Sequence, residues 1–302
     1  MIPLIDTHQH LWDLSRLKLQ WIKGRGLLEH DHMMSDYLKA KEGTGIDSTV
    51  YMEVDADPNY WDREVADMTI HCKNIDTPMK ALVIPGDPLS NDFGIYLEKH
   101  SKNPFVKGIR RVLQISETEP GLCLKPDFVE GVRKIGQSGL LFVICIRPAE
   151  LIDAVTLVKQ CPETSFVLDH CGNADPYIVN GTHNLITKSD IFGSRYMHSQ
   201  QGWRNAISDL GGQKNVFCKI SGIVARIRKG WDSETLAPTI NACLDSFGSE
   251  NVIFGGDWPV CRQGAELKNW VKAFREVLSR RDVAFQHKVM HQNAERIFSL
   301  SS

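Results

Sequence analysis

Short apolar runs alternate along the chain with longer stretches in which apolar residues recur every three or four positions. The apolar runs are six to eight residues long and rich in Val, Ile, Leu and Phe, which is typical of strands. They are nearly continuous rather than alternating, as expected for a parallel sheet that is covered on both faces. The eight predicted strands are 2–7, 47–54, 79–85, 106–113, 140–147, 164–169, 215–221 and 251–256.

The stretches between these runs have the period of amphipathic helices. Residues 127–137, for example, place Phe128, Val132 and Ile135 on one stripe with charged residues between them. The same pattern occupies 148–160, 233–247 and 265–280. Eight strand–helix units in 302 residues predict an α/β fold, a single (β/α)8 TIM barrel that forms one domain over residues 1–302. An open doubly wound sheet is the alternative, but no GxGxxG motif follows the first strand.

One segment interrupts the regular alternation. About residues 171–212 separate the sixth predicted strand from the seventh, and they contain Asp175-Pro176, Asn180-Gly181 and Gly193. Such residues are typical of turns and loops. We predict an enlarged loop on the barrel rim, with one helix near residues 203–210.

Composition narrows the class of protein. Hydrophobic residues make up 42% and charged residues 24%, with a net charge of −2, so neither a disordered chain nor a general nucleic-acid-binding surface is expected. No apolar run approaches the ~20 residues that a membrane span needs. The eight cysteines include no CxxC pair, and no leader precedes the first predicted strand. We therefore expect a cytoplasmic protein with a small-molecule substrate and no nucleic-acid or membrane partner, and homo-oligomer formation is left open.

Ionisable residues follow the predicted strands, at the end of a TIM barrel where active sites are built. His8 and His10 are two residues apart, so on an extended chain both side chains point the same way, with Asp6 in the same row as a group that could orient them. His170 follows the sixth strand and Asp257 follows the eighth. These four residues, His8, His10, His170 and Asp257, are a candidate set for one zinc ion with an open water position. Alternatively, the imidazoles act directly on a substrate oxygen.

Several motifs resemble those of the amidohydrolase superfamily, and more narrowly its amidohydrolase-2 branch. They are DTHQHLWD at 6–13, KGIR at 107–110, LDHCG at 168–172, KISG at 219–222, FGGDWPV at 254–260 and NA at 293–294. The resemblance extends from Asp6 to about Phe298. This branch contains sugar lactonases and 2-pyrone-4,6-dicarboxylate lactonase.

The resemblance implies a role for each matching residue. Asp257 corresponds to the general base, Arg110 to a substrate-binding group, and His8, His10 and His170 to groups that ligate a metal or polarise the scissile carbonyl. At most one divalent metal ion such as zinc is implied, it is dispensable in several lactonases of the branch, and no organic cofactor is expected. Glu53, Arg147, Lys219 and Trp258 stand at or near other strand ends, and we expect them to line the substrate pocket.

Taken together, these features predict a hydrolase that opens a small sugar-acid lactone similar to L-fucono- or L-rhamnono-lactone. A carboxylate that activates water, opposite groups that polarise the carbonyl, supplies the chemistry of that reaction. The main alternative is a metal-dependent decarboxylase, or another hydrolase of the branch, that acts on a small carboxylated substrate. A metal-dependent phosphodiesterase and a non-catalytic sugar-acid binding protein are further alternatives.

Overall fold

Eight parallel strands form one sheet whose order around the barrel is the order along the chain. The computed structural model describes residues 1–182, 197–228 and 230–300. The strands are β1 Leu4–Gln9, β2 Ile46–Met52, β3 Met79–Pro85, β4 Val106–Val112, β5 Leu141–Cys145, β6 Phe166–Leu168, β7 Val216–Ile220 and β8 Val252–Phe254. β1 approaches β8 through a Gln9–Trp258 bridge and a 2.8 Å hydrogen bond from Asp257 N to His8 O, so the barrel is nearly closed. The predicted (β/α)8 barrel is therefore confirmed.

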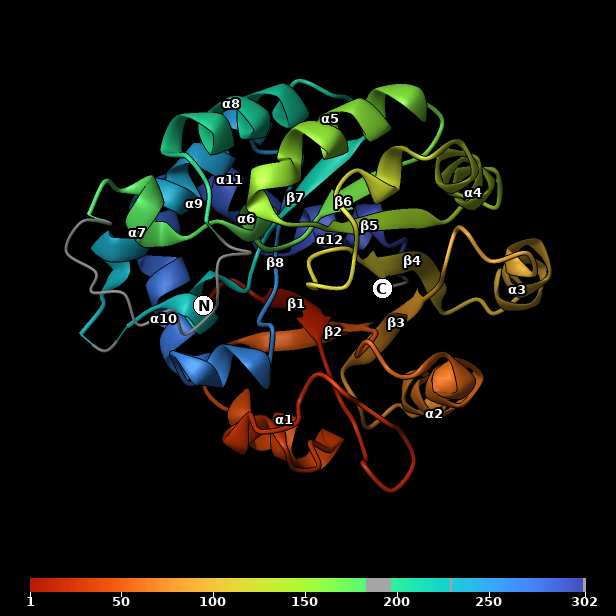
Figure 1. The fold of residues 1–302 in the computed structure, drawn as a ribbon. Helices are drawn as coiled ribbons and strands as arrows, with labels where there is room; N and C mark the ends of the chain where they lie inside the picture. The colour runs from red at the N-terminus through yellow and green to blue at the C-terminus, as the bar shows by residue number, and fades with distance from the viewer. Residues whose placement is uncertain (183–196, 229, 301–302) are drawn as a thin grey trace.

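Helices surround this ring of strands (Figure 1). Their apolar faces lie against the outward-facing side chains of the strands; Trp270 and Phe274, for instance, pack against Phe254 with ring centroids 5.5 and 4.6 Å away. No helix in the described ranges is long and apolar enough to cross a membrane. The helices are α1 Met34–Ala40, α2 Trp61–Lys73, α3 Phe93–His100, α4 Pro126–Gln137, α5 Leu151–Gln160, α6 His170–Asn173, α7 Pro176–Val179, α8 Gln200–Gly211, α9 Ser233–Phe247, α10 Leu267–Leu278, α11 Val283–His287 and α12 Asn293–Ile297.

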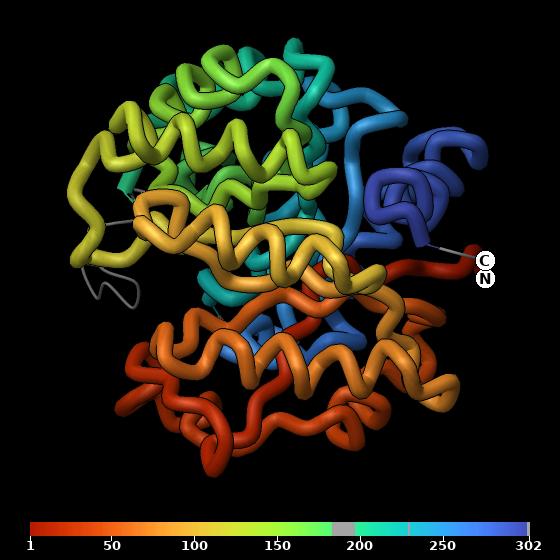
Figure 2. The backbone as a smooth tube through the Cα atoms, turned by 90° about the vertical axis from the view of Figure 1, so that its right-hand side faces the viewer, coloured from red at the N-terminus to blue at the C-terminus, as the bar shows by residue number. Residues whose placement is uncertain are grey.

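The inside of the barrel is apolar beneath the carboxyl ends of the strands. Because successive strand residues point to opposite faces, Val50 and Met52 face inward with Val143 and Phe217, whereas Tyr51 faces the helices. Ala294 of α12 and Phe298 belong to the same inner cluster. Both ends of the chain lie toward one end of the barrel (Figure 2). The inner apolar layers support the polar groups at the carboxyl ends of the strands.

The predicted strand limits differ from the observed ones mainly at the ends. β3 has the predicted bounds, whereas β1 begins and ends two residues later than expected, because pairing with β2 starts at Leu4 and Ile46. His8 is therefore part of the strand rather than of the following loop. β6 and β8 are only three residues long, so Asp169, expected within the sixth strand, belongs to the loop that follows it.

The segment after β6 is more structured than a loop. It contains the short helices α6 and α7 and ends in α8, which covers the helix predicted near 203–210. Residues 183–196, in the middle of the predicted enlarged loop, lie outside the described residues.

Glu64 of α2 fixes the turn that follows β2. Its Oε1 accepts hydrogen bonds from the Tyr51 hydroxyl (3.0 Å) and from the backbone N–H of Val54 (3.1 Å). Glu64 is fully buried, and burial together with the nearby Glu53 carboxylate raises the pKa of its carboxyl to about 8. The folded protein therefore holds a proton that the unfolded chain releases near its ordinary pKa of 4.5.

We predict that Glu64→Gln removes a pH-dependent loss of stability. The pKa of Glu64 is higher in the folded state than in the unfolded chain. Its contribution to the unfolding free energy of the wild type is therefore fully present below about pH 4.5 and is lost as the pH rises to about 8. The amide keeps the acceptor for Tyr51 and Val54 but never ionises. At pH 8 the variant should exceed the wild type in unfolding free energy by on the order of 1–3 kcal/mol, and this excess should shrink toward pH 5.

Urea unfolding at several pH values measures this difference. Glu98→Gln is the matched control, because Glu98 is exposed and pairs with Lys102, which lies two residues beyond the end of α3 and is also exposed. An excess stability for Glu64→Gln that does not change between pH 5 and pH 8 would contradict the assignment.

Candidate functional site

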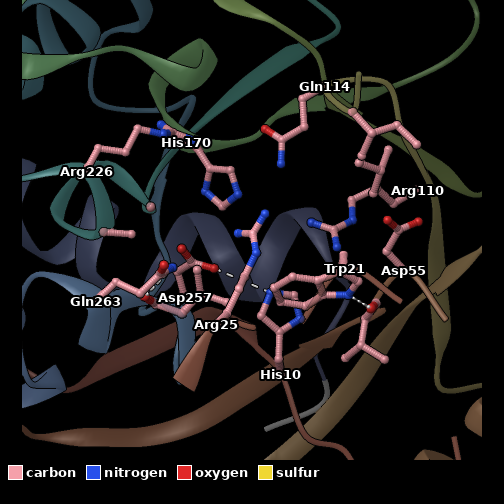
Figure 3. A pocket seen from close by; sticks show the side chains of 16 residues that line it. His10, Trp21, Arg25, Asp55, Arg110, Gln114, His170, Arg226, Asp257 and Gln263 are labelled. Atoms are coloured by element: carbon pink, nitrogen blue, oxygen red, sulfur yellow. Dashed lines mark hydrogen bonds and ion pairs between the residues drawn. The ribbon is translucent and has the colours of Figure 1, made fainter. Parts of the chain in front are cut away.

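A pocket opens at the carboxyl ends of the strands, where the loops meet. It encloses about 120 Å³ and is lined on its polar side by residues from several loops and strands (Figure 3). His170 and Asp257 lie on one side of the pocket, and Arg110, Asp55 and Gln114 lie on the other. The polar lining residues are His10, Arg25, Asp55, Arg110, Gln114, His170, Arg226, Asp257 and Gln263.

Four of the nine predicted site residues line this pocket, and three more lie buried against them. His10, Arg110, His170 and Asp257 are in the lining. The other three, His8, Glu53 and Lys219, are almost completely buried: His8 and Glu53 contact lining residues, and Lys219 contacts His8. We expected Glu53 and Lys219 to line the pocket, but they lie beneath its lining residues and do not face it.

Arg147 and Trp258 do not line the pocket. Arg147 donates to both oxygens of Glu150 (2.6 and 2.9 Å) and to the backbone oxygen of Ile115 (2.7 Å), which places its charge on the loop. Trp258 is 2% exposed and packs edge-on against His32 and Tyr37. The first side chain is held by an acid three residues along the chain, and the second by aromatic neighbours.

Asp169 organises the buried layer beneath the pocket. One carboxylate oxygen lies 2.9 Å from Lys219 Nζ and 3.4 Å from His8 Nδ1, and the other lies 3.2 Å from Arg110 Nη1. Arg110 also pairs with Glu53, at 2.5 Å. Two cations and two carboxylates thus neutralise one another in a region that water does not reach.

The pKa values in this layer follow from burial and from these pairs. Burial alone raises the pKa of Asp169, but Lys219 and His8 more than offset it and hold the value well below the usual range. Burial lowers the pKa of Lys219, which Asp169 opposes. Burial also lowers the pKa of His8 well below its usual value, so this imidazole is neutral at pH 7.

His8 and His10 are linked to each other and to the groups around them. His10 Nδ1 lies 2.9 Å from the backbone oxygen of Met52, which has no hydrogen to give, so this nitrogen is the donor. His8 Nε2 lies 3.1 Å from His10 Nε2 and 3.5 Å from Arg110 Nη1. His8 Nδ1 lies 3.4 Å from Lys219 Nζ.

Asp6 does not orient the two imidazoles, contrary to expectation. Its carboxylate accepts from the backbone N–H groups of His8 (2.9 Å) and Gly256 (2.6 Å) and from the Tyr37 hydroxyl (2.7 Å). It therefore joins β1 to the loop after β8 and fixes the backbone on which His8 and Asp257 stand.

His170 is held by Ser221 and by the absence of a side chain at Gly222. The Ser221 hydroxyl lies 2.9 Å from His170 Nδ1 and also accepts the His170 backbone N–H at 3.3 Å. A Cβ on Gly222 would lie 2.3 Å from His170 Nδ1. Burial lowers the pKa of His170 to about 4, so the ring is neutral at pH 7.

The Asp257 carboxylate lies beside both His8 and His10. Its Oδ1 lies 3.6 Å from His8 Nε2 and 3.4 Å from His10 Nε2. Burial raises its pKa, but the histidines, His170 first, outweigh that effect and lower the pKa to about 2. An ionised carboxylate therefore faces the pocket at neutral pH.

Three pocket residues have left-handed backbone conformations that non-glycine residues rarely adopt. Asp55 (φ 51°), His170 (φ 57°) and Asp257 (φ 55°) each lie within three residues of the carboxyl end of a strand. Such conformations cost free energy and persist where the surroundings enforce them, often at functional sites.

The donor atoms suit a single metal ion. His8, His170 and Asp257 each offer one ligand atom, and these atoms lie within 4.8 Å of one another. Two imidazole nitrogens and one carboxylate oxygen form a set that zinc accepts, with a further position for water or substrate. His10, the fourth predicted ligand, adjoins this group through Asp257.

Sequence reasoning missed Asp169, Trp21, Arg25, Asp55 and Gln114. Asp169 and Asp55 had a detectable signal, because Asp169 is the last residue of the predicted sixth strand and Asp55 directly follows the predicted second strand. Trp21 and Arg25 reach the pocket from the loop between β1 and α1, with Arg25 5.6 Å from the Trp21 ring. No feature of the sequence around Trp21 or Gln114 indicates that its side chain faces the pocket.

Comparisons with known proteins agree with this architecture. The model of the Amidohydro_2 family, described as amidohydrolase, matches residues 5–300. An L-fucono-1,5-lactonase of Burkholderia multivorans is 24% identical over 305 residues, which covers 98% of this chain and 96% of that protein. An L-rhamnono-gamma-lactonase of Scheffersomyces stipitis is 20% identical over 304 residues and 85% of each chain.

A solved structure has the same fold over the whole chain. It is an amidohydrolase from Burkholderia multivorans with bound zinc, and it superimposes with a TM-score of 0.81 at 21% identity, covering 99% of this chain and 100% of that one. The resemblance inferred from the motifs is thus confirmed along the full length of the barrel.

We predict that Gly222→Ala displaces His170 and lowers activity without unfolding the protein. The added methyl group would meet the imidazole at 2.3 Å, and a misplaced catalytic group can cost about 100-fold in kcat/KM. Steady-state kinetics together with thermal unfolding measures both effects.

Gly121→Ala is the matched control. Gly121 has a similar left-handed backbone (φ 77°), but nothing lies within 4 Å of its Cβ position. Both variants bear the same conformational strain, so an equal loss of activity in the two would rule out contact with His170 as the cause.

Proposed function

The chain is a hydrolase of the amidohydrolase family, and we propose that it opens the ring of a small sugar-acid lactone. The observation that carries this proposal is the ionised Asp257 carboxylate, which faces a pocket lined by His10, His170 and Arg110. The likeness to L-fucono- and L-rhamnono-lactonases supports the choice of a lactone. The substrate is thus proposed to resemble those two lactones.

Asp257 would activate the attacking water. Its carboxylate accepts one water proton as the water oxygen bonds to the lactone carbonyl carbon. The ring C–O bond then breaks, and the leaving alkoxide takes a proton back from Asp257. The product is the open hydroxy acid, and no oxidant or reductant is needed.

His170 would stabilise the carbonyl oxygen as negative charge develops on it. Because Ser221 Oγ accepts the His170 backbone N–H, its own hydrogen is available for Nδ1. Nε2 then carries a hydrogen that can be donated to the oxyanion. Arg110 adds a permanent positive charge to the pocket wall, because burial lowers its pKa but the Glu53 and Asp169 carboxylates outweigh that effect and hold the pKa above the usual value.

A divalent metal ion fits the same site, and its ligands would be His8, His170 and Asp257. When bound, such an ion supplies Lewis-acid polarisation of the carbonyl and lowers the pKa of a water molecule. The Ser221 hydroxyl serves this arrangement as well, because it can accept from Nδ1–H and leave Nε2 of His170 as the ligand atom.

We predict that the purified protein releases acid from L-fucono-1,5-lactone or L-rhamnono-γ-lactone, and that Asp257→Asn abolishes this activity. Loss of a general base typically costs 10²–10⁴-fold, so kcat should fall by about that factor. A pH-indicator assay against a panel of aldonolactones measures the rate. Asp209→Asn, on the exposed face of α8, is the matched control and should retain wild-type activity.

Two outcomes would contradict the proposal. Asp257→Asn with wild-type rates on every lactone that is opened would exclude the carboxylate as the base. Carbon dioxide release from a carboxylated aromatic acid, abolished by chelation, in a protein that opens no lactone would instead support the metal-dependent decarboxylase.

A further inference from the structure

Two polar groups on the pocket wall opposite Asp257 make no bond within the described part of the protein. Gln114 follows β4 and points into the pocket (Figure 3), and its Oε1 is inaccessible to solvent and has no hydrogen-bond partner. Asp55 follows β2, and its carboxylate has no hydrogen bond or ion pair to another residue that the structure describes. Buried polar atoms are normally hydrogen-bonded, so the Gln114 oxygen requires an explanation, whereas the half-buried Asp55 carboxylate is open to the same pocket.

The backbone of Asp55 is built to hold this carboxylate in the pocket. Its left-handed conformation (φ 51°) is fixed by a 2.6 Å hydrogen bond from its N–H to Glu53 Oε2. Glu53 in turn pairs with Arg110 at 2.5 Å. A strained conformation supported by a buried ion pair indicates that the position of the side chain matters.

The chemistry of the two groups selects one kind of partner. A glutamine amide offers both a donor and an acceptor, and a carboxylate offers only acceptors. A hydroxyl group can donate to Asp55 and can both donate to and accept from Gln114. A substrate carboxylate would be repelled by Asp55, and an apolar group would leave the buried Gln114 oxygen without a hydrogen-bond partner.

We propose that Gln114 and Asp55 are specificity-determining residues that bind hydroxyl groups of the lactone ring, on the side away from the attacking water. This inference rests on the proposed lactonase function and identifies the ring hydroxyl groups as the part of the substrate that these two residues recognise. The preferred substrates are polyhydroxy lactones, and lactones without ring hydroxyls are poor substrates because Gln114 and Asp55 then stay unpaired.

The test compares two six-membered lactones that share the reacting ester but differ in hydroxyl groups. L-Fucono-1,5-lactone carries ring hydroxyls, and δ-valerolactone carries none. Gln114→Leu removes the amide at similar size, and Asp55→Gly removes the carboxylate while suiting the left-handed backbone. Gln137→Leu, on an exposed turn of α4, is the matched control.

Each pocket variant should lower kcat/KM for the hydroxylated lactone by about 10- to 100-fold, the effect of one lost buried hydrogen bond. It should change kcat/KM for δ-valerolactone by less than about threefold, since that substrate never made the bond. The ratio of the two values is the readout that a merely structural role would not move. Thermal unfolding verifies that each variant is folded.

Equal losses on both lactones, or no loss on either, would overturn the inference while leaving the lactonase proposal intact. A wild-type protein that opens neither lactone, nor any other of the aldonolactone panel, would overturn the proposed function and this inference with it.

Discussion

The upper half of the barrel depends on the neutralisation of buried cations by Asp169. Lys219 is fully buried and Arg110 is 5% exposed, and burying a charge without a partner is far more costly than any single packing contact can offset. Asp169 lies within ion-pair distance of both, and Glu53 supplies the second negative charge. The Asp169 carboxylate also contacts His8, so the same residue that neutralises the buried cations also positions the His8 imidazole.

This arrangement links the fold to the proposed chemistry. Asp169 follows β6 and Lys219 belongs to the neighbouring β7, whereas Arg110 reaches Asp169 from β4, two strands away from β6. A closed parallel barrel is what brings these strand ends to one place. Lys219 in turn meets His8, and His8 meets His10 and Asp257, so the base proposed to activate water stands at the end of a fixed chain of contacts.

The sequence was sufficient for the fold because most strands are largely apolar runs and the longer helices between them have an apolar stripe. It was also sufficient for His10, His170, Asp257 and Arg110, which stand at strand ends and face one pocket. Arg147 could have been excluded from the pocket, since Glu150 three residues later is a local partner for its charge. Trp258 could not, because its packing against His32 and Tyr37 depends on a loop from a different part of the chain.

The pocket side chains that were missed also depend on tertiary structure. Trp21 and Arg25 come from a loop whose path across the barrel mouth has no signature in its residues, and Gln114 lies in an ordinary polar segment. The left-handed conformations of Asp55, His170 and Asp257 are likewise imposed by the surrounding structure. Local patterns thus indicate which elements form, whereas the direction of loop side chains is decided by what packs around them.

A double-mutant cycle on unfolding free energy, with Asp169→Asn, Lys219→Met and the double variant, tests most directly whether this ion pair organises the site. Each single change should destabilise the protein by about 3–5 kcal/mol, because each leaves an uncompensated buried charge. The loss of unfolding free energy in the double variant should be smaller than the sum of the two single losses by more than about 1 kcal/mol. Additive effects would contradict the account.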